Sequence, residues 1–71
     1  MNPRYAAVLD IFALVSTYPP EARVLREATQ VTALAYIRGE ATAGDLRLLL
    51  FLAKDLGYVS EDLVEAHQQF L

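Results

Sequence analysis

Residues 46–53 read Leu-Arg-Leu-Leu-Leu-Phe-Leu-Ala, and Arg47 is the one polar side chain in this run. Consecutive residues point in different directions around a helix axis, so the apolar side chains of residues 48–52 surround such a helix. Residues 5–15 repeat the pattern, with Asp10 as the one polar side chain. A helix that is apolar all round needs cover on every side, and a chain of 71 residues has a small core. We therefore expect other chains to supply part of the cover.

Turn signals on both sides of these runs divide the chain into four helical segments. Pro3 suits a first helical turn, and Pro19 followed by Pro20 ends one helix and opens the next. Gly39 and Gly57 are typical of the residue just after a helix. The predicted helices span residues 3–17, 20–38, 43–56 and 61–70. Their short connections and the absence of period-two alternation predict an all-α fold, a small antiparallel four-helix bundle in one domain over residues 1–71, with helix above about 70%.

Local capping signals support two of these helix starts. Thr42 and Asp45 have the spacing of a capping box at the third helix. Ser60 is typical of an N-cap at the fourth helix, where Val59 and Val64 occupy the positions of a hydrophobic staple. These residues predict where both helices begin.

The apolar residues of the second segment suggest which side of that helix faces the core. They form one stripe at helical spacing, with residues 25, 34 and 37 beside it. The members of the stripe are Val24, Ala28, Val31 and Ala35. Arg23, Arg26, Glu27 and Gln30 are expected towards solvent.

Composition excludes several classes of protein. Hydrophobic residues make up 55% of the chain, which excludes disorder, and the absence of cysteine excludes disulfides and thiolate metal sites. Nine acidic against six basic residues give a net charge of −3, which is not typical of a surface that binds phosphate backbones. No apolar run approaches the ~18–20 residues of a membrane span. Asp10 and the lack of a small-residue cleavage site argue against a signal peptide, and we expect a cytoplasmic protein without membrane association.

No set of residues has catalytic or metal-binding chemistry at a usable spacing. His67 is the only histidine and has no second histidine or cysteine to complete a metal site. Glu61, Asp62 and Glu65 cluster early in the last helix, where the helix dipole favours acids without any catalytic role. The glycines are too dispersed for a phosphate loop. We therefore predict no enzyme, no metal and no cofactor.

The junction of the third and fourth segments has one alternative interpretation. Ala53, Gly57 and Leu63 have the spacing of a helix-turn-helix, which would place residues 60–70 in a DNA major groove. From Asp55 onwards the chain holds four acids and no lysine or arginine, so this helix would meet phosphates with like charge. An ordinary helical hairpin is favoured, and a small DNA-binding regulator is kept as an alternative function.

Two segments have apolar residues on more than one side. Ile11 and Leu14 lie away from the stripe formed by residues 5, 8, 12 and 15. Leu48 and Leu52 pair at i, i+4 and are able to line an outer face while residues 49 and 56 line the core; the sequence leaves open which face points inward. The predicted interface for self-association therefore consists of Ile11, Leu14, Leu48 and Leu52.

The stretch LRLLLFLAKDLGYVSEDL, residues 46–63, resembles the last two helices of a known family of small four-helix bundles. This family includes the intervening-sequence ribosomal bundle proteins and the accessory variability proteins of diversity-generating retroelements. Its leucine-rich helix ends in a similar Leu-Ala-Lys-Asp-Leu-Gly stretch. Residues 18–20, Tyr-Pro-Pro, before Leu25 and Gln30 are similar to the family's passage from first to second helix.

The resemblance implies a non-enzymatic bundle that assembles into a homopentameric barrel. In the retroelement branch it also implies binding to a reverse transcriptase and to nucleic acid. This chain is shorter than the family pattern in its second and third helices and lacks a basic excess. The basic residues beyond the N-terminus that are available for nucleic-acid contact are Arg23, Arg26, Arg38, Arg47 and Lys54.

The function predicted from these observations is that of a non-catalytic, self-associating helical adaptor or accessory protein. The resemblance narrows this prediction to an accessory subunit of a reverse transcriptase complex. Besides the DNA-binding regulator, a phage- or plasmid-type inhibitor that docks on a host enzyme is a further alternative, which small size and acidity permit.

Overall fold

The computed structural model describes residues 2–69 and 71, and in them the chain is helical and contains no strand. The elements in order are α1 (Pro3–Val15), the short 3-10 helix η1 (Pro20–Ala22), α2 (Arg23–Ile37), α3 (Ala43–Asp55) and α4 (Glu61–Gln68). Helix accounts for 75% of the structure. The predicted all-α class is confirmed.

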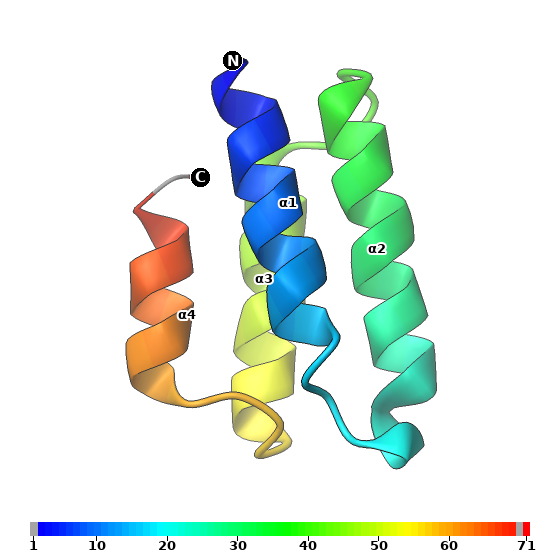
Figure 1. The fold of residues 1–71 in the computed structure, drawn as a ribbon, viewed down its shortest axis with the longest axis vertical. Coiled ribbons are helices and arrows are strands. Elements are labelled where there is room, and N and C mark those ends of the chain that lie inside the picture. Colours follow the sequence, from blue (N-terminus) through cyan, green and yellow to red (C-terminus); the bar gives the residue numbers. More distant parts are fainter. Residues whose placement is uncertain (1, 70) are drawn as a thin grey trace.

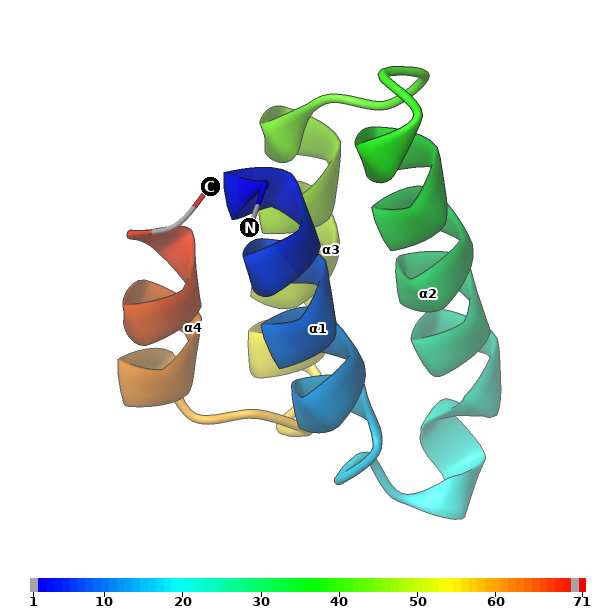
Figure 2. The same ribbon diagram turned by 45° about the horizontal axis from the view of Figure 1, so that its top comes forward.

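The four helices alternate in direction and lie side by side (Figure 1). Each helix packs against its neighbour in sequence, and α4 closes the bundle by packing against α1. Figure 2 shows α2 and α4 at opposite edges of the molecule, with α1 and α3 between them. This arrangement confirms the predicted antiparallel four-helix bundle.

Side chains and glycines at the helix ends adopt the conformations that the sequence predicts. The Thr42 side chain accepts a hydrogen bond from the backbone of Asp45 at 3.2 Å, and the Asp45 carboxylate accepts one from Thr42 N–H at 2.9 Å. Ser60 caps α4 by accepting from the backbone of residue 63. Gly39 and Gly57 have φ of 76° and 82°, in the left-handed region that favours glycine after a helix.

The ends of three helices differ from the predicted ranges by two or three residues. Helix α1 ends at Val15 because the hydroxyls of Ser16 and Thr17 bond to carbonyls three residues earlier, and the Thr17 amide bonds to Leu14 in the same tighter spacing. Helix α2 begins at Arg23, after η1, rather than at residue 20. Helix α4 ends at Gln68, and the predicted end at residue 70 lies outside the described residues.

The core buries two of the residues predicted for the oligomer interface. Ile11 and Leu14 are 1% and 6% exposed and pack inside the chain's own bundle. That prediction is wrong because α1 packs against both α2 and α4, so a wider arc of α1 is covered than one apolar stripe. Tyr5 and Leu9 are the large apolar side chains that α1 exposes instead.

The side of α2 that faces the core is also not the predicted one. Thr29 and Ala33 are fully buried, whereas Val24 and Val31 are 81% and 64% exposed. The Thr29 hydroxyl donates to the carbonyl of Leu25 at 2.8 Å, which satisfies this polar group and allows its burial. The stripe that the sequence places inward therefore points away from the core.

The structure also decides which leucines of α3 face inward. Leu46 and Leu50 are fully buried together with Ala53. The alternative in which Leu49 and Leu56 line the core is wrong, because the first is only partly buried and the second is exposed. Apolar side chains thus remain on the outer side of α3 as well as α2.

Candidate protein interface

Two hollows lie between α2 and α3, with volumes of about 360 and 370 Å³. Leu49 of α3 lines both, so the hollows adjoin along one groove between the two helices. We call this surface the α2–α3 face. Its apolar residues from α2 are Val24, Leu25, Ala28, Val31 and Ala35, and those from α3 and its C-cap are Leu48, Leu49, Leu52 and Leu56.

Exposed apolar side chains concentrate on the α2–α3 face. Ten large hydrophobic side chains are exposed in the described residues, and five of them line the two hollows. Val24 and Leu48 are the most exposed of all, at 81% and 70%. Single exposed apolar residues are normal on a protein surface, whereas a contiguous apolar patch marks an interaction site. The α2–α3 face is therefore the candidate functional site.

Helical spacing explains how this face is built from the sequence. In α2, residues 24, 28, 31 and 35 recur every three or four positions and fall on one side of the helix. In α3 and its C-cap, residues 48, 52 and 56 do the same. Ala28 and Ala35 are small, so they leave the hollows open between larger neighbours.

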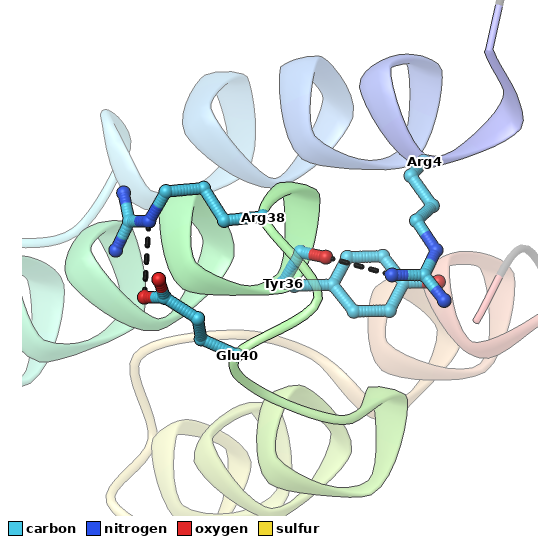
Figure 3. Close-up of polar contacts among 4 residues, drawn as sticks. All are labelled: Arg4, Tyr36, Arg38 and Glu40. Carbon is cyan, nitrogen blue, oxygen red and sulfur yellow. Dashed lines mark hydrogen bonds and ion pairs between the residues drawn. The ribbon is translucent and has the colours of Figure 1, made fainter.

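Charged side chains lie towards the ends of α2 rather than at its middle. Arg23 forms an ion pair with Glu27 at 3.0 Å. Arg38 forms one with Glu40 at 3.1 Å, as the dashed line in Figure 3 marks. Asp45 lines the first hollow, but its carboxylate is engaged in the capping box. The lining of the groove is therefore mostly apolar, and its charged members are Asp45 in the first hollow and Glu21 in the second.

Leu48 and Leu52, which the sequence assigns to the interface, both lie on the α2–α3 face and are exposed. Sequence reasoning missed Val24 and Val31, because it placed their stripe in the core. The signal was present, since the stripe is recognisable from its spacing. The sequence does not show whether this stripe faces the core or the surface, because periodicity alone does not say which neighbour covers an apolar side of a helix.

The basic residues considered for nucleic-acid contact do not form one patch. On α2, Arg23 and Arg38 lie at opposite ends, about 22 Å apart along the helix, and each has an acidic partner. On α3, Arg47 donates to the carbonyl of Leu71 at 3.2 Å, and the Lys54 ammonium lies 5.0 Å from the ring centre of Phe51. Arg26 is partly buried on α2. Nucleic-acid contact stays a prediction.

The acidic and histidine side chains of α4 are separate from the α2–α3 face. Glu61, Asp62 and Glu65 are exposed. His67 is partly buried, and its Nδ1 lies 2.7 Å from the carbonyl oxygen of Leu63. Among residues 2–69 and 71, no group of three or more His, Cys, Asp or Glu side chains is placed to hold a metal ion.

One buried polar group was not anticipated from the sequence. Tyr18 is buried, and its hydroxyl has no hydrogen-bond partner among the described residues. Its ring centre lies 6.1 Å from that of Tyr58, which lines the second hollow. Burial raises the pKa of Tyr18 above its ordinary value of 10.0.

The junction of α3 and α4 has the form of a helical hairpin. Figures 1 and 2 both show the two helices side by side and opposite in direction. A DNA-binding helix-turn-helix has its helices at about 90–120° to each other.

Within the described part of the chain, no helix has the length and apolar character that crossing a membrane requires.

Comparisons of the chain with protein-family models, with curated proteins and with solved structures found no match. The resemblance to ribosomal and retroelement bundle proteins therefore stays a prediction.

Proposed function

We propose that the protein is a non-catalytic, self-associating adaptor, and that its α2–α3 face binds a second copy of the chain. The observation that carries the proposal is the division of apolar residues between core and surface. Ile11, Leu46 and Leu50 fill the core of the bundle, while large apolar side chains remain on the α2–α3 face. A fold that is already closed gains nothing from these exposed side chains until another surface covers them.

The hydrophobic effect supplies the driving force for such an association. Burying apolar surface is worth roughly 25 cal/mol per Å², and fully burying one valine or leucine side chain about 1.5–3 kcal/mol. A stable interface takes about 800 Å² from each partner. This is roughly a fifth of the 4379 Å² surface of the chain. One side of two adjacent helices, α2 and α3, is a surface of suitable extent.

Charge favours a second copy as the occupant of the face. The middle of the groove has no charged side chain to bury, and beside it the two ends of α2 carry charges of both signs through the ion pairs Arg23–Glu27 and Arg38–Glu40. Two copies therefore meet without forcing like charges together, even though each chain carries a net charge of −3.

An adaptor also needs a surface that self-association leaves free. Helix α4 lies at the opposite edge of the bundle from α2 (Figure 2) and exposes Glu61, Asp62 and Glu65. A further partner is able to bind there while α2 is covered. The narrower proposal, an accessory subunit of a reverse transcriptase complex, rests on the family resemblance alone.

The proposal is tested by comparing two substitutions of equal exposure. Leu52 on the α2–α3 face and Leu63 on α4 are 46% and 45% exposed. Leu52→Glu is expected to release monomers, because association would bury a charge without water or a partner. Leu63→Glu is the matched control and is expected to leave the mass unchanged.

Light scattering over a concentration series measures the masses, and circular dichroism checks that both variants remain helical. Loss of association in both variants or in neither would contradict the assignment of this face.

A further inference from the structure

We infer that the second copy packs with its α2 antiparallel to α2 of the first, around a two-fold axis that passes between Val31 and Leu34. In this pairing Glu27 of each copy faces Arg38 of the other. The inference rests on the proposed self-association and goes further, because it fixes the symmetry, the direction and the ion pairs that select them.

The first support is a symmetry in the outward side of α2. Glu27 lies four residues before Val31, and Arg38 lies four residues after Leu34. All four side chains are exposed in the structure. Residues three and four apart share one side of a helix, so these four form a continuous outer strip. When two such strips pack antiparallel, the apolar side chains of the two copies meet at the centre. Opposite charges then meet at both ends.

The second support is that both charged groups retain unused bonding atoms. Arg38 pairs with Glu40 through Nε, as Figure 3 shows, and within the described residues its two terminal nitrogens make no hydrogen bond. Glu27 pairs with Arg23 through Oε1, which leaves Oε2 free of hydrogen bonds in the same part of the chain. Each guanidinium therefore has donors, and each carboxylate an acceptor, for a partner on a second copy.

The third support is that a parallel pairing is penalised. Two parallel α2 helices in register would place Glu27 against Glu27 and Arg38 against Arg38, and like charges at close range repel. An antiparallel pairing with a two-fold axis gives each contact twice, since residue i of one copy meets residue j of the other and the reverse.

The groove beside α2 is compatible with this pairing. Leu48 lines the same hollow as Val31 and Ala35, so it flanks the proposed axis from α3. Ala35 has a small side chain, which permits close approach of the second helix. Val31 of the second copy then lies against Leu34 of the first, and Leu34 of the second copy lies against Val31, which borders the hollow.

Charge exchange tests the ion pairs. Glu27→Arg and Arg38→Glu each replace two attractive contacts per dimer by repulsive ones, and each is expected to raise the dissociation constant about tenfold. The double variant that carries both changes is expected to recover most of the wild-type affinity. This recovery has no intramolecular source, because the exchange disrupts both local pairs and residues 27 and 38 lie about 16 Å apart along α2.

Cross-linking tests the direction. The chain has no cysteine, so each variant with one introduced cysteine reacts at one known position. Chains with Glu27→Cys and chains with Arg38→Cys are mixed and treated with a bifunctional maleimide that spans less than the distance between positions 27 and 38. Cross-links between unlike chains are expected, and cross-links between two Glu27→Cys chains are not.

The outcomes separate the inference from the proposed function. Cross-links between like chains, or a dimer whose affinity the charge exchange does not restore, would overturn the antiparallel pairing while self-association stands. A larger assembly, such as the pentamer implied by the family resemblance, would also overturn the antiparallel pairing while self-association stands. A wild-type chain that stays monomeric would overturn both.

Discussion

The guanidinium group of Arg4 on α1 lies over the ring of Tyr36 on α2, with 4.8 Å between the guanidinium carbon and the ring centre. Its Nη1 also donates a hydrogen bond to the backbone carbonyl of Tyr36 at 3.0 Å (Figure 3). One side chain therefore joins the start of α1 to the end of α2. Because α2 stands at the edge of the bundle, this contact helps to hold α2, with the outer strip of residues 27, 31, 34 and 38, against α1.

Replacing Arg4 with Ala removes the hydrogen bond and the contact with the ring. We expect the free energy of unfolding to fall by about 1 kcal/mol, measured by urea denaturation. Arg23→Ala is the matched control, because it removes only an exposed ion pair within one helix and is expected to change stability by less than about 0.5 kcal/mol. Equal effects of both substitutions would contradict a specific role for Arg4.

Tyr18→Phe is expected to leave the stability unchanged or to raise it by up to about 1 kcal/mol at neutral pH. The hydroxyl is buried without a hydrogen-bond partner among the described residues, so its removal relieves desolvation while the ring keeps its packing. Thermal and urea unfolding of both chains measure the difference. A loss above about 1 kcal/mol would mean that the hydroxyl makes a stabilising contact.

The same burial predicts a dependence of stability on alkaline pH. In the unfolded chain Tyr18 ionises near its ordinary pKa of 10.0, whereas burial raises the pKa in the folded chain. Above pH 10.0 the folded state binds more protons than the unfolded state, so the free energy of unfolding falls as pH rises towards the folded pKa. Tyr18→Phe removes this contribution, and its stability should fall less steeply over the same range. Identical slopes would contradict the raised pKa.

Two glycines are expected to respond to alanine with opposite signs. Gly57 has φ of +82°, so alanine is strained there even though its Cβ would meet no atom within 4 Å, and we expect a loss of about 1–2 kcal/mol. Gly44 lies in the first turn of α3, where a Cβ would make an ordinary contact at 3.5 Å with Thr42. Gly44→Ala is therefore expected to stabilise the protein by about 0.5–1 kcal/mol. Unfolding midpoints in urea measure both, and a shared sign would be the contrary result.

Much of the fold is predictable because its signals are local. The prolines at 19 and 20, the glycines at 39 and 57 and the capping box at Thr42 each act on the adjoining backbone, without help from distant residues. They place the four helices to within about three residues. The direction of each helix follows from the short connections between them.

The orientation of each helix about its own axis depends on contacts with other helices, and the sequence predicts it less well. Ile11 and Val24 both belong to apolar patterns, yet one is buried and the other is exposed. Which side is covered depends on the neighbouring helices and on how close they approach. Thr29 lies on the buried side of α2, and its hydroxyl donates a hydrogen bond to the carbonyl of Leu25 in the same helix. A hydrophobicity pattern counts threonine as a polar residue and therefore predicts that this side of α2 faces solvent.

The mass of the wild-type chain in solution tests the central claim most directly. Sedimentation equilibrium from low to high micromolar concentration measures it without any substitution. If the α2–α3 face binds a second copy, the mass rises with concentration from 7.9 kDa towards twice that value. A mass that stays at 7.9 kDa through the high micromolar range would contradict self-association.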